Sequence, residues 1–160
     1  MNQHVDKAME LRNEMPMVNN CAQTIMRVYA DELGMNEEQA AAIGCNFGGG
    51  MKCGGTCGAI TSGLMVLGAM GIDSPKVVGE YRKRMAGMHD GLTDCAALLQ
   101  ENARKGGEKK VHCDIIHFLR REMLDFTAFP VFFVSNLLLV QRKKYYFNRA
   151  TVSRNCSIVL

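Results

Sequence analysis

The sequence predicts an all-α protein: a small bundle of about six short helices with a glycine-rich loop, followed by an atypical C-terminal tail. Three observations support this fold class. Apolar residues recur at helical spacing along most of residues 1–125, and residues that start or stop helices flank these segments. No segment alternates apolar and polar residues as a half-buried strand does. The length of 160 residues and the hydrophobic content of 48% suit one soluble globular domain with a real core.

The first three predicted helices precede the glycine-rich loop. They are expected over Val5–Met15, over Asn20–Leu33 and from Glu37 to about Asn46. The second helix has the clearer apolar face, formed by Ala22, Ile25, Met26, Tyr29 and Leu33, and Gly34 ends it. The stretch from residue 45 to residue 68 then holds three cysteines and eight glycines before it becomes an apolar run.

The later helices follow this loop. Cys57–Met70 is the most apolar of them, and Gly71 stops it. Ser74 and Pro75 signal the start of the next helix, whose apolar residues are Val77, Val78, Tyr81, Met85 and Met88. A short helix is expected from Cys95 to about Ala103, and another from His112 or Cys113 to about Leu124.

The charge of the chain is unevenly distributed. Residues 1–125 contain all 16 acidic residues and 14 of the 19 Lys and Arg residues, whereas residues 126–160 contain five basic residues and no acidic one. The basic balance therefore belongs to the tail, and nothing in the body indicates nucleic-acid binding. The N-terminus lacks the basic start and apolar core of a secretory signal, which favours the cytoplasm. Thiols stay reduced in the cytoplasm, so structural disulfides do not explain the seven cysteines of the chain.

A change of composition after Asp125 predicts a boundary between a helical, cysteine-rich domain over 1–125 and a tail over 126–160. The tail begins with "FTAFPVFFVSNLLLV", which would span roughly 23 Å as a helix, against a hydrocarbon core of about 30 Å. Pro130 would also interrupt that helix. A full membrane span is therefore not expected. The basic and aromatic residues that follow would suit a membrane surface, but we favour an appendage that contributes nothing to the cysteine site.

The positions of the cysteines relative to helix starts are the main functional signal. Cys21, Cys57 and Cys95 each follow a residue of a good N-cap type, namely Asn, Thr and Asp. Cys113 follows His112, which is a weaker cap. Unpaired N–H groups and the positive dipole end of a helix favour thiolates, which bind metals or attack disulfides. We therefore expect a lowered pKa for Cys57 and a shared thiol site where the apolar helix faces meet.

Other interpretations of these residues remain open. Free cysteines often only fill a core, and this applies most to Cys45 and Cys156. Cys53 and Cys57 form a C-x3-C spacing, which is not the C-x2-C of zinc ribbons and thioredoxin-like sites. His117 lies one turn after Cys113 and could be a ligand, although an ordinary histidine is the favoured interpretation. The loop lacks the terminal G-K-[ST] of a phosphate-binding loop and the preceding strand of a dinucleotide site.

The stretch "NNCAQTIMRVYADELGMNEEQAAAIGCNFGGGMKCGGTCGAITSGLMVLG" resembles the redox-active proteins named for the pattern C…C-G-A-x-x-G…C…C. The resemblance extends from Asn20 to about Glu122. It implies that the four recurring cysteines fall on Cys21, Cys57, Cys95 and Cys113, and that Cys53 corresponds to an extra loop cysteine of some members. Ser62 stands at the closing glycine of the central motif, with Gly63 one residue later. The resemblance also implies redox activity with a bound iron–sulfur or similar group.

We expect the sulfurs of these four cysteines to converge on an iron–sulfur or other transition-metal centre that passes electrons to a redox partner protein. One alternative is a metal-free protein in which Cys53 and Cys57 cycle between dithiol and disulfide. Another is a structural zinc-binding interaction module. Nothing in the sequence decides whether the protein is an enzyme.

Overall fold

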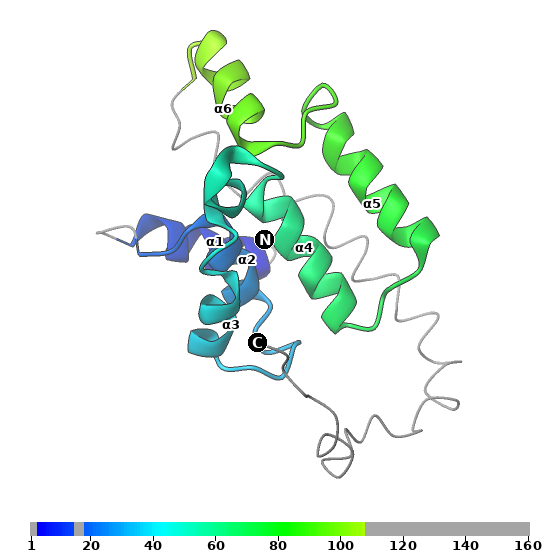
Figure 1. Ribbon diagram of the computed structural model, residues 1–160. Coiled ribbons are helices and arrows are strands. Elements are labelled where there is room, and N and C mark those ends of the chain that lie inside the picture. The colour runs from blue at the N-terminus through cyan, green and yellow to red at the C-terminus, as the bar shows by residue number, and fades with distance from the viewer. Residues whose placement is uncertain (1–2, 15–17, 108–160) are drawn as a thin grey trace, which may run out of the picture. The chain divides into compact units, whose positions relative to one another are not determined.

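The computed structural model describes residues 3–14 and 18–107, which form six α-helices and one π-helical turn (Figure 1). The elements are α1 (Gln3–Asn13), α2 (Cys21–Val28), α3 (Glu37–Gly44), η1 (Gly50–Gly54), α4 (Gly58–Ala69), α5 (Pro75–Gly87) and α6 (Cys95–Arg104). Within these residues the only β-type pairing is an isolated antiparallel bridge between Thr56 and Asp94. The predicted all-α class is confirmed. The helix expected from Cys113 and the tail over 126–160 lie outside the described residues.

No helix in the described part of the chain combines the length and the apolar character needed to cross a membrane.

Asparagine caps fix where α2 and α3 begin. The side-chain oxygen of Asn20 accepts hydrogen bonds from the backbone N–H groups of Ala22 (2.9 Å) and Gln23 (3.0 Å), and the Gln23 side chain accepts from the Asn20 N–H. Such a reciprocal capping box satisfies N–H groups that a helix start leaves unpaired. Asn36 and Gln39 form the same arrangement at the start of α3. Both helices therefore begin within a residue of the predicted positions.

α2 ends earlier than predicted, at Val28 instead of Leu33. The chain tightens there, because the N–H of Ala30 bonds to the carbonyl of Arg27 and the N–H of Gly34 bonds to that of Asp31, each three residues back. These residues form turns, and Gly34 has a φ of +64°, which favours glycine.

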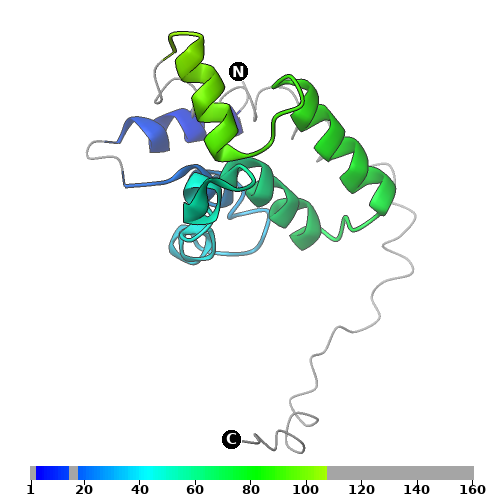
Figure 2. The same cartoon turned by 45° about the horizontal axis from the view of Figure 1, so that its top comes forward.

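The apolar core is built around α2, which packs against α1, α3 and α4 (Figures 1 and 2). Its buried members from α2 are Ala22, Ile25, Met26 and Val28, and α4 contributes Ala59, Ile60, Val66 and Leu67. α1 adds Val5, Ala8 and Leu11. The short helices are thus held mainly by one shared apolar core, since helices of this length are marginal on their own.

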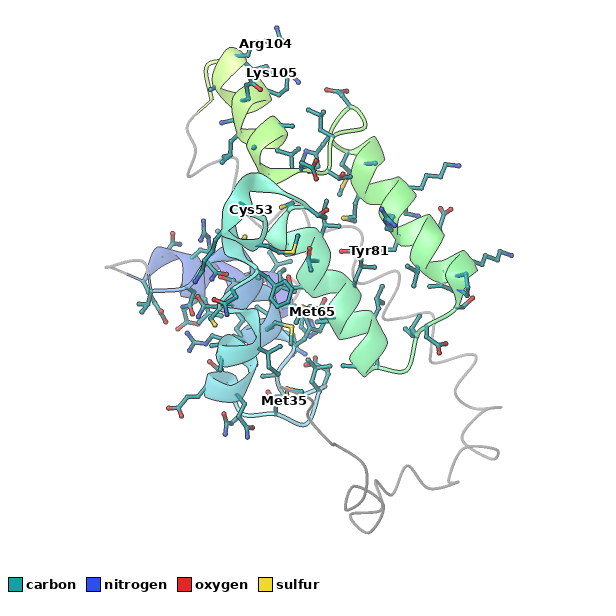
Figure 3. The ribbon with its side chains drawn as sticks, viewed as in Figure 1. Met35, Cys53, Met65, Tyr81, Arg104 and Lys105 are labelled. Carbon is teal, nitrogen blue, oxygen red and sulfur yellow. The ribbon has the colours of Figure 1, made fainter. Side chains whose placement is uncertain are left out.

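α5 contacts α4 and is tied to it by a buried phenol. Tyr81 of α5 is fully buried between these two helices (Figure 3), and its hydroxyl donates a hydrogen bond of 3.1 Å to the carbonyl of Ile60. Gly71, with a φ of +80°, follows the end of α4, and Pro75 is the first residue of α5. The stop at Gly71 and the start at Pro75 are as predicted.

Candidate thiol site

Cys21 is the first residue of α2 and is half-buried. The capping box of Asn20 fixes the helix start immediately before it. The Asn20 amide also donates a hydrogen bond of 3.0 Å to the carbonyl of Cys45, which ties the start of α2 to the beginning of the glycine-rich loop. The prediction that Cys21 lies in a first helical turn is confirmed.

Cys57 is itself the N-cap residue of α4, because the helix begins at Gly58. The prediction that Thr56 caps this helix is therefore wrong by one residue. Thr56 instead pairs with Asp94 in the antiparallel bridge, which occupies its backbone in an extended segment.

The bridge joins the starts of α4 and α6, as Figures 1 and 2 show. The N–H of Cys57 donates to the carbonyl of Thr93 (2.8 Å), and the N–H of Cys95 donates to the carbonyl of Gly55 (2.7 Å). These two bonds flank the non-hydrogen-bonded pair of an antiparallel ladder. Asp94 is the N-cap residue of α6, as predicted, although its side chain makes no cap hydrogen bond. The backbone thus brings two cysteines from distant parts of the sequence to neighbouring helix starts.

Gly58 lets the sulfur of a third cysteine, Cys21, approach the start of α4. A Cβ atom built on Gly58 would lie 2.8 Å from the sulfur of Cys21 and 2.5 Å from the carbonyl oxygen of Phe47. Both separations are shorter than real Cβ contacts, so only glycine fits. The missing side chain leaves the space in which the Cys21 sulfur packs against the first residue of α4, next to Cys57.

The pKa of Cys57 depends on burial, on the start of α4 and on two other thiols. Burial raises the pKa of the Cys57 thiol to about 11, and the negative charges of Cys21 and Cys95 raise it further, whereas the N–H groups of Ala59 and Ile60 lower it. The predicted lowering of the Cys57 pKa is wrong, because the loss of water around the thiol outweighs the favourable helix start.

A buried tyrosine lies close to this thiol. Burial raises the pKa of Tyr81, and the charges of Cys57 and Tyr29 add to that effect. The Tyr81 hydroxyl is bonded to the carbonyl of Ile60, one turn after Cys57. The sequence placed Tyr81 on an apolar helix face but carried no signal that it would lie near a cysteine.

Cys53 lies in a strained turn before α4 (Figure 3) and is exposed. Its thiol donates a hydrogen bond of 3.3 Å to the carbonyl of Gly50. Met51 and Lys52 have φ angles of 57° and 58°, so two non-glycine residues adopt the left-handed conformation in succession. Such residues cost free energy and persist only where the surroundings hold them. The predicted pairing of Cys53 with Cys57 stays a prediction, because the thiols that act on Cys57 are Cys21 and Cys95.

The remaining predicted ligand, Cys113, lies outside the described residues, as does His117. Convergence of all four sulfurs on one site therefore stays a prediction. Among residues 3–14 and 18–107, no group of three or more His, Cys, Asp or Glu side chains is arranged to hold a metal ion. In the described part of the chain, the three thiols do not by themselves make a ligand set.

A sequence model of the family described as "Putative redox-active protein (C_GCAxxG_C_C)" matches residues 19–119, which is more than half of the chain. The matched range contains the glycine-rich loop and the four predicted ligands, Cys21, Cys57, Cys95 and Cys113. The family description writes its central element with the cysteine between glycine and alanine, whereas here Gly58 follows Cys57 and precedes Ala59. No curated protein and no solved structure matches the chain.

Proposed function

Since the chain belongs to the C_GCAxxG_C_C family of redox-active proteins, we propose that it exchanges electrons through its thiols, with Cys21 and Cys57 as the reacting pair. The observation that carries this proposal is the packing at Gly58. A Cβ on Gly58, the residue that follows Cys57, would lie 2.8 Å from the Cys21 sulfur, so this sulfur packs against the start of α4. Cys95 lies within electrostatic reach of the same thiol.

The proposed step is thiol–disulfide exchange with a disulfide of a partner protein. The Cys21 thiolate attacks one sulfur of that disulfide, and the other partner sulfur leaves as a thiolate. The Cys57 thiol gives its proton to the thiolate released in the first step, and its sulfur then attacks the Cys21 sulfur of the mixed disulfide. This forms the 21–57 bond and releases the second partner sulfur as a thiolate, which takes a proton from water. The partner gains two electrons and two protons, and the pair of cysteines loses them. The raised pKa of Cys57 keeps it protonated until this second step.

A metal centre is the second candidate, and one observation favours it. The charges of Cys21 and Cys95 raise the pKa of Cys57, which is the repulsion expected of thiolates held together. A cation among them would remove that repulsion. Cys113 would supply the fourth thiolate of the set predicted from the sequence. An iron–sulfur or other transition-metal centre would supply one-electron transfer to a redox partner, and zinc would instead be structural.

One set of measurements tests both candidates. The full chain is purified without oxygen, analysed for iron, zinc and sulfide, and then treated with a small disulfide for increasing times before peptide mapping. We expect a metal-free protein in which the 21–57 link forms first. Cys53→Ser should keep that link, and Cys57→Ser should abolish it.

Different outcomes would overturn the thiol proposal in different ways. If the 53–57 link forms first and Cys53→Ser stops rapid oxidation, the pair predicted from the sequence is the reactive one. Broad absorption near about 400 nm together with iron and sulfide would establish the cluster instead. Zinc alone, bound tightly enough to block oxidation, would favour the structural role.

A further inference from the structure

A hollow of about 410 Å³ lies beside the thiol site, between α4, α5 and the loop segments that precede α4 and α6. Its size is within the range of small-molecule sites, about 300–1,000 Å³. The α4 residues that line it are Ile60, Thr61 and Leu64. They stand three, four and seven residues after Cys57, so they continue the helix face that this cysteine begins.

Three hydrogen bonds connect two residues of the walls of this hollow, Thr61 and Thr93, to the backbone of Cys57. The N–H and the hydroxyl of Thr61 both donate to the Cys57 carbonyl, at 2.9 Å and 3.2 Å. On the other side, the Thr93 carbonyl accepts the N–H of Cys57 at 2.8 Å. A molecule in the hollow would therefore contact residues that hold Cys57 from both sides.

The charge of the lining is entirely positive among the described residues. Arg82 and Lys83 of α5 both line the hollow, and no acidic residue does. Within the described part of the chain neither makes an ion pair, whereas their neighbour Arg84 bonds to Glu80 at 3.0 Å. The rest of the surface is largely apolar, with Leu64 on one wall and Met51, 48% exposed, at the loop.

The larger hollow on α6 provides a contrast. Arg104 lines that hollow, but Glu101 lines it too, and two nitrogens of Arg104 bond to the Glu101 carboxylate at 2.6 Å and 2.7 Å. Its cation is therefore already neutralised. The positive charge beside Cys57 has no such partner among the residues described.

We propose that the hollow beside Cys57 binds an organic carboxylate with an apolar body. Its carboxylate lies between Arg82 and Lys83, where a charge-assisted hydrogen bond is available. Its apolar part lies on Ile60 and Leu64, and the threonine hydroxyls can bond to polar substituents. Binding itself does not require the thiols to react, whereas the use of this hollow as a substrate pocket rests on the proposed function.

The test is a titration of the full chain, with its thiols reduced, against 2-naphthoate and the uncharged 2-naphthamide by calorimetry and NMR. We expect saturable binding of 2-naphthoate, with shifts at Ile60 and Leu64. Loss of one charge-assisted hydrogen bond in Arg82→Gln or Lys83→Gln should weaken binding by about tenfold. The amide carries no charge to pair with either side chain, so it should bind at least as weakly to wild type. Lys76→Gln removes one exposed charge from the same helix outside the hollow and should change the affinity by less than about twofold.

The proposal would be overturned if Arg82→Gln and Lys83→Gln bound 2-naphthoate with the affinity of wild type. It would also be overturned if the NMR shifts were confined to another surface, or if binding did not saturate at millimolar 2-naphthoate. Spectra of each variant without ligand exclude loss of fold as the cause of weaker binding. No cysteine is among the described residues that line the hollow, so Cys57→Ser should bind naphthoate like wild type. If the 21–57 link does not form, the naphthoate titration still tests the hollow. If naphthoate does not bind, the disulfide mapping still tests the proposed thiol chemistry.

Discussion

Replacing Gly58 by alanine tests the packing that brings Cys21 beside Cys57. The new Cβ would lie 2.5 Å from the Phe47 carbonyl oxygen and 2.8 Å from the Cys21 sulfur. Ordinary contact begins at 3.4 Å, so the carbonyl would have to move by about 0.9 Å. Backbone cannot yield as a flexible side chain can, and overpacking of this kind costs about 1–3 kcal/mol. Because alanine's higher helix propensity offsets at most about 1 kcal/mol, we expect a net destabilisation of about 1–2 kcal/mol.

The assay is thermal and denaturant unfolding of the reduced protein, combined with the rate at which the 21–57 link forms. For a chain of this length, the expected loss lowers Tm by about 2–8 °C. The displaced sulfur should also make the link form more slowly. Gly68→Ala is the matched control on the same helix, because a Cβ there meets nothing within 4 Å. It should stabilise the protein by about 0.5–1 kcal/mol and leave the disulfide rate unchanged.

The reasoning would be refuted if Gly58→Ala melted at or above the wild-type temperature. It would equally be refuted if the variant lost stability and the 21–57 link formed at the wild-type rate, since the sulfur position would then not depend on Gly58. A loss of the same size in Gly68→Ala would show that the effect belongs to the helix and not to this contact.

Three further predictions concern the buried hydroxyls, the thiol and the first cap. Tyr81→Phe removes the hydrogen bond to the Ile60 carbonyl and should cost about 1 kcal/mol in urea unfolding. Tyr29→Phe should be neutral or stabilising, because the buried Tyr29 hydroxyl has no hydrogen-bond partner within the described residues; equal losses in the two variants would contradict this. The pKa of Cys57 is raised from 9.0 to about 11, so its contribution to stability should be complete below pH 9 and fall as the pH rises from about 9 to 11. Its iodoacetamide alkylation should accelerate over the same range, and Cys57→Ser should lose this pH dependence of stability; rapid alkylation at pH 7 would argue against the burial effect. Asn20→Ala should cost about 1–2 kcal/mol by circular dichroism melting, and a cost near zero would mean that the capping box does not support α2.

Local sequence signals predicted most helix boundaries, because caps and stops act within a few residues. Asn20 and Asn36 each carry a glutamine three residues later, which completes a capping box. Pro75 suits a first helical turn, and Gly71 suits the left-handed residue after a helix. The same signals predicted that Cys21 and Cys95 lie at helix starts. They failed at Thr56, because α4 begins one residue later than predicted, with Cys57 as its N-cap residue.

The left-handed run through Met51 and Lys52 could not be predicted in the same way. Glycine-rich sequence indicates that a tight turn can form, but nothing in a methionine or a lysine indicates a positive φ. The turn is held by contacts made across the loop. The Gly55 N–H bonds to the Gly50 carbonyl at 3.0 Å, and the Lys52 ammonium bonds to the Asn46 side chain at 2.9 Å. These contacts exist only once the loop has closed.

The sequence by itself determined the helical class and the family, since periodicity, caps and cysteine spacing are properties of short segments. Only the tertiary structure decided which thiols meet and in what state. The bridge between Thr56 and Asp94 joins two helix starts from distant parts of the chain, and Gly58 admits the Cys21 sulfur beside them. The direction of the Cys57 pKa depends on how much water the fold removes from the sulfur. A helix start favours the thiolate locally, but burial is a property of the whole packed core, and here burial is the larger effect.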